Sequence, residues 1–247
     1  MNDRKLDIGA TISQAFSIYG SQAGVLLPVA FGIFLIAAVI NGILAGSLIL
    51  FPLAIAVSMI ASTLYAGTVV QLVSDVQDGK RDSSAGDLIS SATPFILPLI
   101  GAGILAGLGI GLGLLLLVVP GLFLLTIWCV IAPAIVVEKK GVLDAFGRSR
   151  ELVRGNGWQV FGVIVTVFVI VLVVNLVLTA VAIGIDDSAV VQIVFNIIGQ
   201  TITAPVAALV AAVLYFKLRA HEGDAAQPAA PAQQPAPTDL PPNPTTA

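Results

Sequence analysis

Charged side chains are scarce in this chain. Only 10% of its 247 residues are Asp, Glu, Lys or Arg, whereas 57% are hydrophobic. A soluble domain carries about 25% charged residues. Because a water-soluble fold cannot hide this much apolar surface, lipid must solvate part of it. The composition therefore predicts an all-α integral membrane protein.

Cysteine and histidine are almost missing as well. The chain has one cysteine, Cys129, and one histidine, His221. It therefore cannot form an internal disulfide framework, a Ser-His-Asp triad or a metal site made of several His and Cys ligands. We expect no cofactor, no metal and no nucleic-acid partner.

Long apolar runs divide the chain into six candidate spans, each near the roughly 20 residues that a helix needs to cross a bilayer. The apolar block 94–137 would be about 66 Å long as a single helix, so we expect it to fold back at Pro120-Gly121. The first run is too long for a signal peptide and is expected to be retained. The predicted spans are 23–46, 49–74, 94–118, 121–137, 158–185 and 188–216, within a membrane domain of residues 1–221.

All eleven basic residues fall on one side of this six-span arrangement. The other side carries only two charged residues, Asp186 and Asp187. The positive-inside rule therefore predicts that both termini are cytoplasmic. The basic residues are Arg4, Lys5, Lys80, Arg81, Lys139, Lys140, Arg148, Arg150, Arg154, Lys217 and Arg219.

A weak repeat of about 70 residues places an amphipathic segment before each helical hairpin. The three segments are 8–20, 84–93 and 142–154, and their pattern is typical of helices lying in the headgroup plane. The predicted apolar face of the first consists of Ile8, Ile12, Ala15, Phe16 and Tyr19. That of the third consists of Val142, Phe146, Ser149 and Val153.

Residues 222–247 are rich in proline and alanine and almost free of bulky apolar residues. Such a composition cannot form a core, so a disordered cytoplasmic tail with local polyproline II structure is predicted. The tail is either a solvated segment, which its composition favours, or a ligand for a proline-binding domain.

The predicted spans contain no Asp, Glu, Lys, Arg or His. This absence argues against ion-coupled transport and intramembrane hydrolysis, which commonly need such groups at bilayer depth. The polar side chains present either bond between helices or line a groove. For a groove we favour span six, where Asn196 and Gln200 share a face and Pro205 opens the backbone. The polar residues are Asn41, Asn175, Gln192, Asn196, Gln200, Thr201 and Thr203.

Glycines recur at four-residue spacing in span three. Gly103, Gly107 and Gly111 lie on one face, and Gly109 and Gly113 lie on a second. Small residues at this spacing allow close helix approach, either within the bundle or in a dimer.

The loop between spans four and five has the densest charge. Arg148, Arg150 and Arg154 either set the topology and attract anionic lipid in general, or form a specific anionic-headgroup site. Asp144 and Arg148, at i and i+4, are placed to pair on one helix.

The stretch from Pro120 to Phe161 resembles the bacterial and archaeal membrane domain named after glycerophosphoryl diester phosphodiesterase, and related uncharacterised multi-pass families. The residues that carry this resemblance are Pro120-Gly121, Trp128, Pro133, Val137-Glu138, Gly141, Ala145, Arg148-Ser149, Leu152, Arg154-Gly155, Trp158 and Phe161, together with Leu214-Tyr215 through Arg219. The resemblance implies a membrane domain in a prokaryotic plasma membrane. It does not imply phosphodiesterase activity, because that activity belongs to a separate barrel domain for which this chain has no room.

Two functional hypotheses follow. The first is a non-enzymatic protein that organises lipid or a partner at the cytoplasmic face, with anionic headgroups, another membrane protein or a second copy of the chain as partners. The alternative is a transporter or channel for a neutral or lipid-like solute. Five prolines within the spans favour the alternative, since broken helices often mark transport sites. They are Pro28, Pro52, Pro98, Pro133 and Pro205.

Overall fold

The computed structural model describes residues 6–44, 47, 49–78, 85–186 and 188–226, which form helices and turns without any strand. This confirms the all-α prediction. The elements are α1 (Ile8–Leu44), α2 (Phe51–Gln77), α3 (Ala85–Ala92), the 3-10 turn η1 (Thr93–Phe95), α4 (Ile96–Leu116), α5 (Val118–Ile127), α6 (Ile131–Glu138), α7 (Val142–Val153), α8 (Gly157–Ile185) and α9 (Ala189–Ala226).

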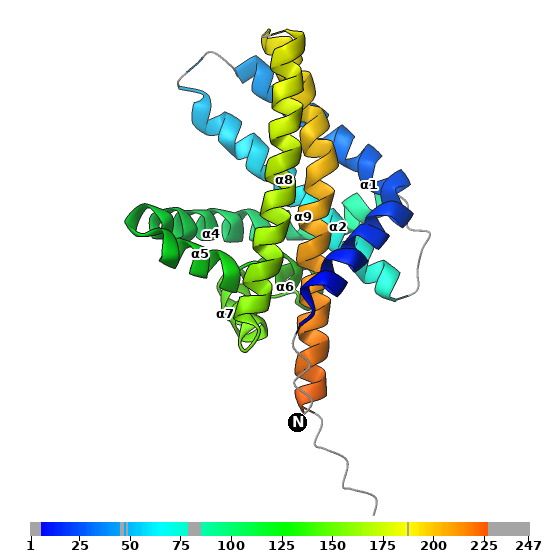
Figure 1. The fold of residues 1–247 in the computed structure, drawn as a ribbon, viewed down its shortest axis with the longest axis vertical. Helices are drawn as coiled ribbons and strands as arrows, with labels where there is room; N and C mark the ends of the chain where they lie inside the picture. Colours follow the sequence, from blue (N-terminus) through cyan, green and yellow to red (C-terminus); the bar gives the residue numbers. More distant parts are fainter. Residues whose placement is uncertain (1–5, 45–46, 48, 79–84, 187, 227–247) are drawn as a thin grey trace, which may run out of the picture.

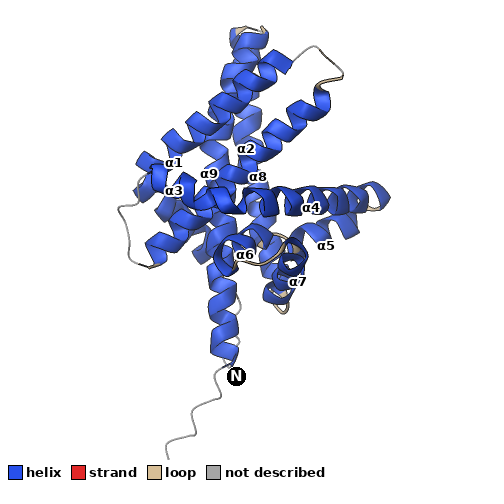
Figure 2. Ribbon diagram, turned by 180° about the vertical axis from the view of Figure 1, so that it is seen from behind, coloured by secondary structure: helices blue, strands red, loops and turns tan. Residues whose placement is uncertain are grey.

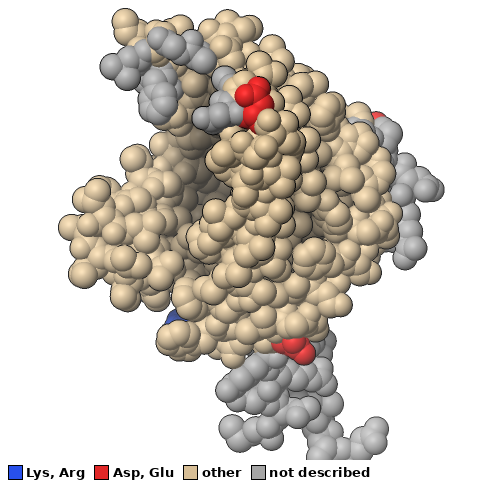
Figure 3. Space-filling model, turned by 45° about the horizontal axis from the view of Figure 1, so that its top comes forward, with Lys and Arg blue, Asp and Glu red and all other residues tan. Residues whose placement is uncertain are grey.

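Six helical segments of the described chain are long and apolar enough to cross a membrane, as the sequence predicts. They are Ile8–Leu44, Leu53–Gln77, Gly86–Leu116, Val118–Glu138, Gly157–Ile185 and Val190–Glu222. The surface agrees with a lipid environment, because the face in Figure 3 is uncharged over most of its area. The chain is therefore a multi-pass α-helical membrane protein.

Helix α9 is the central element of the bundle. It packs against α1, α2 and α8 and also contacts α6 and α7. Its half nearest the C-terminus supplies a large part of the core, since Leu209, Val213 and Tyr215 are completely buried. Figure 1 shows α8 and α9 side by side along the long axis of the molecule, with α1 crossing them.

The amphipathic segment predicted over 8–20 is not a separate helix. It forms the first turns of α1, which continues without a break through Pro28. Its buried face includes Thr11, Ala15 and Ile18, whereas Phe16 is exposed. The prediction of a boundary was wrong because α1 packs against both α9 and α2, and its buried positions continue from Thr11 to Ala37. The two later segments correspond to the separate helices α3 and α7.

Helices α4 and α5 form an antiparallel hairpin that projects sideways from the α8–α9 pair in both ribbon views (Figures 1 and 2). The chain reverses at Leu117, whose extended backbone (φ −160°, ψ 138°) ends α4 and begins α5. The break therefore lies three residues before the predicted Pro120, which instead occupies the first turn of α5. Proline is tolerated there because the first N–H groups of a helix have no partner within it.

The hairpin closes at Gly113 and Gly121. A Cβ on Gly113 would stand 2.9 Å from the Cα of Gly121, so the two backbones are in contact. Gly109 lies under the ring of Trp128. Gly107 and Gly111, by contrast, have open space where a Cβ would stand. Of the two glycine faces predicted from the sequence, the one formed by Gly109 and Gly113 makes the close contacts, and its partners belong to the same chain.

The prolines do not break the long helices. Helices α1 and α9 run through Pro28 and Pro205. Pro52, Pro98 and Pro133 lie within the first three residues of α2, α4 and α6. Helix α9 also extends to Ala226, so the first residues of the predicted tail are helical, and 227–247 lie outside the described residues.

We predict that Gly121→Ala destabilises the protein by about 1–3 kcal/mol, the usual cost of overpacking. The added Cβ would lie 2.6 Å from the backbone nitrogen of Leu114, which cannot move without opening the hairpin. Thermal unfolding in detergent measures the effect. Gly111→Ala is the matched control, since it adds the same methyl group to open space, and equal melting temperatures for the two variants would contradict the close approach.

Candidate functional site

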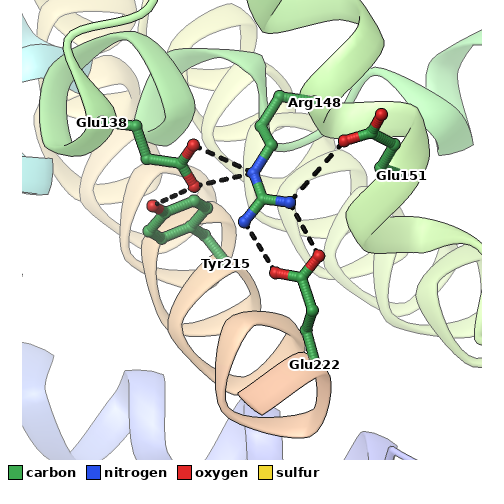
Figure 4. Close-up of polar contacts among 5 residues, drawn as sticks. All are labelled: Glu138, Arg148, Glu151, Tyr215 and Glu222. Atoms are coloured by element: carbon green, nitrogen blue, oxygen red, sulfur yellow. Dashed lines mark hydrogen bonds and ion pairs between the residues drawn. The ribbon is translucent and has the colours of Figure 1, made fainter. Parts of the chain in front are cut away.

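Arg148 lies at the centre of a charged cluster that joins α6, α7 and α9 (Figure 4). Its Nε donates to both carboxylate oxygens of Glu138 at 2.9 Å. Its Nη1 and Nη2 donate to the two carboxylate oxygens of Glu222 at 2.8 and 2.7 Å. Glu151 adds a longer contact of 3.7 Å to Nη1. We call these residues, together with Tyr215, the Arg148 cluster.

Tyr215 completes the cluster from α9. Its hydroxyl donates to Oε1 of Glu138 at 2.9 Å. The side chains of Arg148 and Glu138 are only 17% and 13% exposed, whereas that of Glu222 is 48% exposed. The inner pair is thus shielded from water by the packing of three helices, which makes its geometry more important than that of an exposed ion pair.

Arg148 is positively charged in this cluster. The carboxylate of Glu222 raises the pKa of the Arg148 guanidinium, partial burial acts in the opposite direction, and Glu138 raises the pKa further. Because Nε donates to Glu138 and the two Nη atoms donate to Glu222, the guanidinium holds the three helices together. The pairing of Arg148 with Asp144 that the sequence allowed is not among its contacts.

Local backbone features place α7 for this role. Lys139 ends α6 in the left-handed conformation (φ 54°), which turns the chain sharply before α7 begins. Ser149, fully buried, donates to the carbonyl oxygen of Ile127 at 2.8 Å. That carbonyl lies at the end of α5, where helix termini leave acceptors without partners. Ser149 therefore fastens α7 to the base of the α4–α5 hairpin.

The opposite face of α7 is exposed. Leu143, Gly147, Arg150 and Arg154 recur at helical spacing and are exposed, as are the acidic Asp144 and Glu151. The buried face consists of Ala145, Ser149, Leu152 and Val153. This agrees with the amphipathic helix expected over 142–154. The structure does not bring the three arginines together, because Arg148 turns into the cluster and Arg150 and Arg154 face away from the protein.

The polar residues expected to share a groove also separate. Asn196 lines a small cavity of about 60 Å³ between α8 and α9, with Asn175, Thr179 and Gln192. Gln200 instead lines an open hollow of about 450 Å³. The other residues of that hollow are Asn41, Ala54, Ile55, Ser58, Met59 and Ser62, from α1 and α2.

Two members of the Arg148 cluster were missed by the sequence reasoning. Glu222 stood at the start of the predicted tail, and Tyr215 stood in the last span. Their distance from Arg148 along the chain hides the contact, although a tyrosine followed by a charged end of an otherwise apolar helix is a weak signal. Within the described parts of the chain, no three His, Cys, Asp or Glu side chains group to hold a metal ion.

The fold and the site define a multi-pass helical membrane protein with an amphipathic helix tied to its bundle by a charged cluster. Residues 40–210 match the uncharacterised protein family UPF0259. The chain belongs to that family. No solved structure matches it significantly.

One relative is a UPF0259 membrane protein of Pectobacterium carotovorum subsp. carotovorum (strain PC1), 41% identical over 100 residues. The match covers 40% of this chain and 39% of the relative. These findings correct the resemblance to the glycerophosphoryl diester phosphodiesterase membrane domain, which was wrong because the match is to UPF0259.

We predict that Arg148→Gln strongly lowers thermal stability, because it leaves the shielded carboxylate of Glu138 without its charged partner. Breaking a fully buried pair costs about 3–5 kcal/mol, and we expect a smaller loss of about 2 kcal/mol here because Glu222 stays partly solvated. Arg148→Lys should not restore stability, since lysine lacks the planar fork that binds both carboxylates. Unfolding in detergent measures all variants.

Glu151→Gln is the control for that experiment. Its side chain is 70% exposed and its contact with Arg148 is long, so its removal should change stability by less than about 1 kcal/mol. Equal losses for the Arg148 and Glu151 variants would show that the inner pairs carry no special weight.

Proposed function

We propose that this protein is a non-enzymatic membrane protein that organises anionic lipid at the cytoplasmic face of a prokaryotic plasma membrane. The exposed face of α7 is the single observation that carries the proposal. It combines two basic side chains, Arg150 and Arg154, with the apolar Leu143, which is 76% exposed, and it also carries the acidic Asp144 and Glu151. A helix of this kind lies at the level of the lipid headgroups.

Trp158 supports this placement. It lies at the start of α8, directly after α7, and is 84% exposed. A tryptophan exposed at the end of a long apolar helix is typical of the membrane interface, where its ring sits among the headgroups. Arg150 and Arg154 are close to Trp158 in the sequence, and among the described residues their guanidinium groups have no ion-pair partner.

The orientation of the protein follows from charge. Lys139, Lys140, Arg150, Arg154 and Arg219 are exposed around the ends of α6, α7 and α9. The turn between α8 and α9, at the other end of the pair, carries the acidic Asp186. The positive-inside rule then favours a cytoplasmic position for α7 and for both termini. Lys5 and Arg4 and the loop residues Lys80 and Arg81 lie outside the described residues.

We predict that replacing Arg150 and Arg154 with Gln lowers the ratio of anionic to neutral lipid that is retained by the purified protein. Each basic residue near a charged membrane surface contributes about 1 kcal/mol, or about fivefold in affinity. Native mass spectrometry after purification from vesicles of phosphatidylglycerol and phosphatidylcholine measures the ratio.

The double substitution of Lys139 and Lys140 with Gln is the matched control, because it removes the same charge from the same side of the molecule but not from the α7 face. A specific α7 site requires a clearly larger loss from the arginine pair. If both double variants lower the lipid ratio equally, the effect comes from total positive charge and not from an α7 site. If the arginine variant leaves the ratio unchanged, the proposal is wrong.

A second candidate function is the passage of a neutral solute, and the hollow beside Gln200 favours it. Asn41 donates from its amide nitrogen to Oγ of Ser58 at 2.9 Å, while its buried Oδ1 has no hydrogen-bond partner among the described residues. An unpaired buried carbonyl is costly and attracts a donor. A hollow of about 450 Å³ has room for a small polyol.

For this candidate we predict that Asn41→Leu slows glycerol entry into proteoliposomes, measured by light scattering after rapid mixing. Leucine is close to asparagine in size and removes the unpaired carbonyl without opening a cavity. Asn196→Leu, in the smaller cavity between α8 and α9, is the control. Entry no faster than into protein-free vesicles would exclude this function.

A further inference from the structure

We infer that α4 and α5 do not cross the membrane but form a re-entrant hairpin, which enters from the side that carries α7 and is surrounded by the acyl chains of that leaflet. Length and composition allow the segments Gly86–Leu116 and Val118–Glu138 to cross, whereas the geometry points to an apolar hairpin held within one leaflet. The inference uses the orientation proposed above only to call that leaflet cytoplasmic, and it does not depend on lipid binding by Arg150 and Arg154.

The chemistry of the hairpin tip is the first observation. Leu115, Leu116, Leu117, Val118 and Val119 form the tip, and each is between 61% and 83% exposed. If the hairpin crossed the bilayer, this tip would stand in water or headgroups. Exposing one large aliphatic side chain to water costs about 1.5–3 kcal/mol, so five in succession are compatible only with hydrocarbon around them.

The turn between α8 and α9 provides the contrast within the same chain. It begins at Asp186, an exposed and charged residue, as a turn in water should. The two reversals thus differ in chemistry although both join long apolar helices.

The path of α4 is the second observation. Val142, the first residue of α7, lies 3.5 Å from the position that a Cβ on Gly101 would take. Phe146, one turn further along α7, meets the ring of Trp128 at 4.9 Å, and Trp128 in turn covers Gly109. Gly101 and Gly109 are about 12 Å apart along α4. Helix α4 therefore stays beside α7 over this distance instead of leaving the surface where α7 lies.

The length of the returning arm is the third observation. Helix α5 has 10 residues and α6 has 8, and a turn at Trp128–Val130 separates them. These helices are about 15 and 12 Å long, and neither alone crosses a hydrocarbon core of about 30 Å. The apolar segment Val118–Glu138 is thus bent where a straight span would be needed.

The tip is also built so that few backbone groups lack partners, which a turn inside hydrocarbon requires. Leu117 is the only non-helical residue between α4 and α5, and its N–H still donates to the carbonyl oxygen of Gly113 at 3.0 Å. Pro120, in the first turn of α5, has no N–H to leave unpaired. Contact between Gly113 and Gly121 keeps the arms together without polar side chains.

A re-entrant hairpin leaves the charge pattern unchanged. It begins and ends on the same side, as two crossings would, so every basic residue stays on the side predicted from the sequence. A re-entrant hairpin displaces acyl chains in one leaflet only. The base of this hairpin lies next to Arg150 and Arg154, which we propose to face the headgroups of the same leaflet.

The test is a depth measurement with single nitroxide labels. With Cys129 replaced by Ala, cysteines are placed at Leu105, Leu112 and Leu117 of the full chain in lipid vesicles, and relaxation by oxygen and by a water-soluble nickel complex gives the depth of each label. We expect all three labels in hydrocarbon at depths within about 6 Å of one another. A crossing hairpin requires a steady change of about 18 Å from Leu105 to Leu117.

Two reference labels fix the two surfaces. Gly147→Cys marks the α7 side, and Ser188→Cys marks the α8–α9 turn. A Leu117 label that reaches the depth of the Ser188 label, or that reacts with an impermeant maleimide from that side, would overturn the inference. If the variant without Cys129 is unstable, the same labels are introduced with Cys129 retained, and the signal of the parent protein is subtracted.

Discussion

The packing of α9 against α1, α2 and α8 is the interaction on which the rest of the structure depends. In lipid there is no hydrophobic force between apolar helices, so close packing must hold them together. Two hydrogen bonds also join α1 to α9: the Tyr19 hydroxyl donates to the carbonyl oxygen of Ile202 at 3.4 Å, and Nζ of Lys217 donates to Oγ1 of Thr11 at 3.3 Å. Because α9 continues beyond this core, it carries Tyr215 and Glu222 to Arg148, and so α6 and α7 are fastened to the bundle by the same helix.

The helical geometry of α7 directs its arginines to different sides of the helix. Arg148 and Arg150 are two residues apart and therefore point to nearly opposite sides of the helix. One is neutralised by Glu138 and Glu222, while the other stays free at the surface with Arg154. Of the three arginines that the sequence offered as a headgroup site, Arg148 is thus a structural residue. Its fixed position leaves the remaining two arginines and Leu143 exposed on the other side of the helix.

Local sequence patterns were enough to predict much of the fold. The six apolar segments, the helix at 142–154 and the reversal near Pro120 were all predicted, because each depends on hydrophobicity, periodicity or backbone chemistry within a few residues. The errors arose where distant packing took over. The amphipathic stretch at 8–20 continues into α1 because α9 supports both, and the reversal moved to Leu117 because Gly113 and Gly121 must meet.

The sequence by itself determined that this protein is helical and lives in a membrane. These properties are sums over residues, and they do not depend on which helix lies beside which. Only the tertiary structure decided that Arg148 pairs with Glu222, 74 residues away, and that the α4–α5 hairpin projects sideways from the α8–α9 pair. The reason is that the hydrophobicity of a segment decides whether it lies in lipid or in water. The direction of a helix and its long-range partners depend on packing against the rest of the chain.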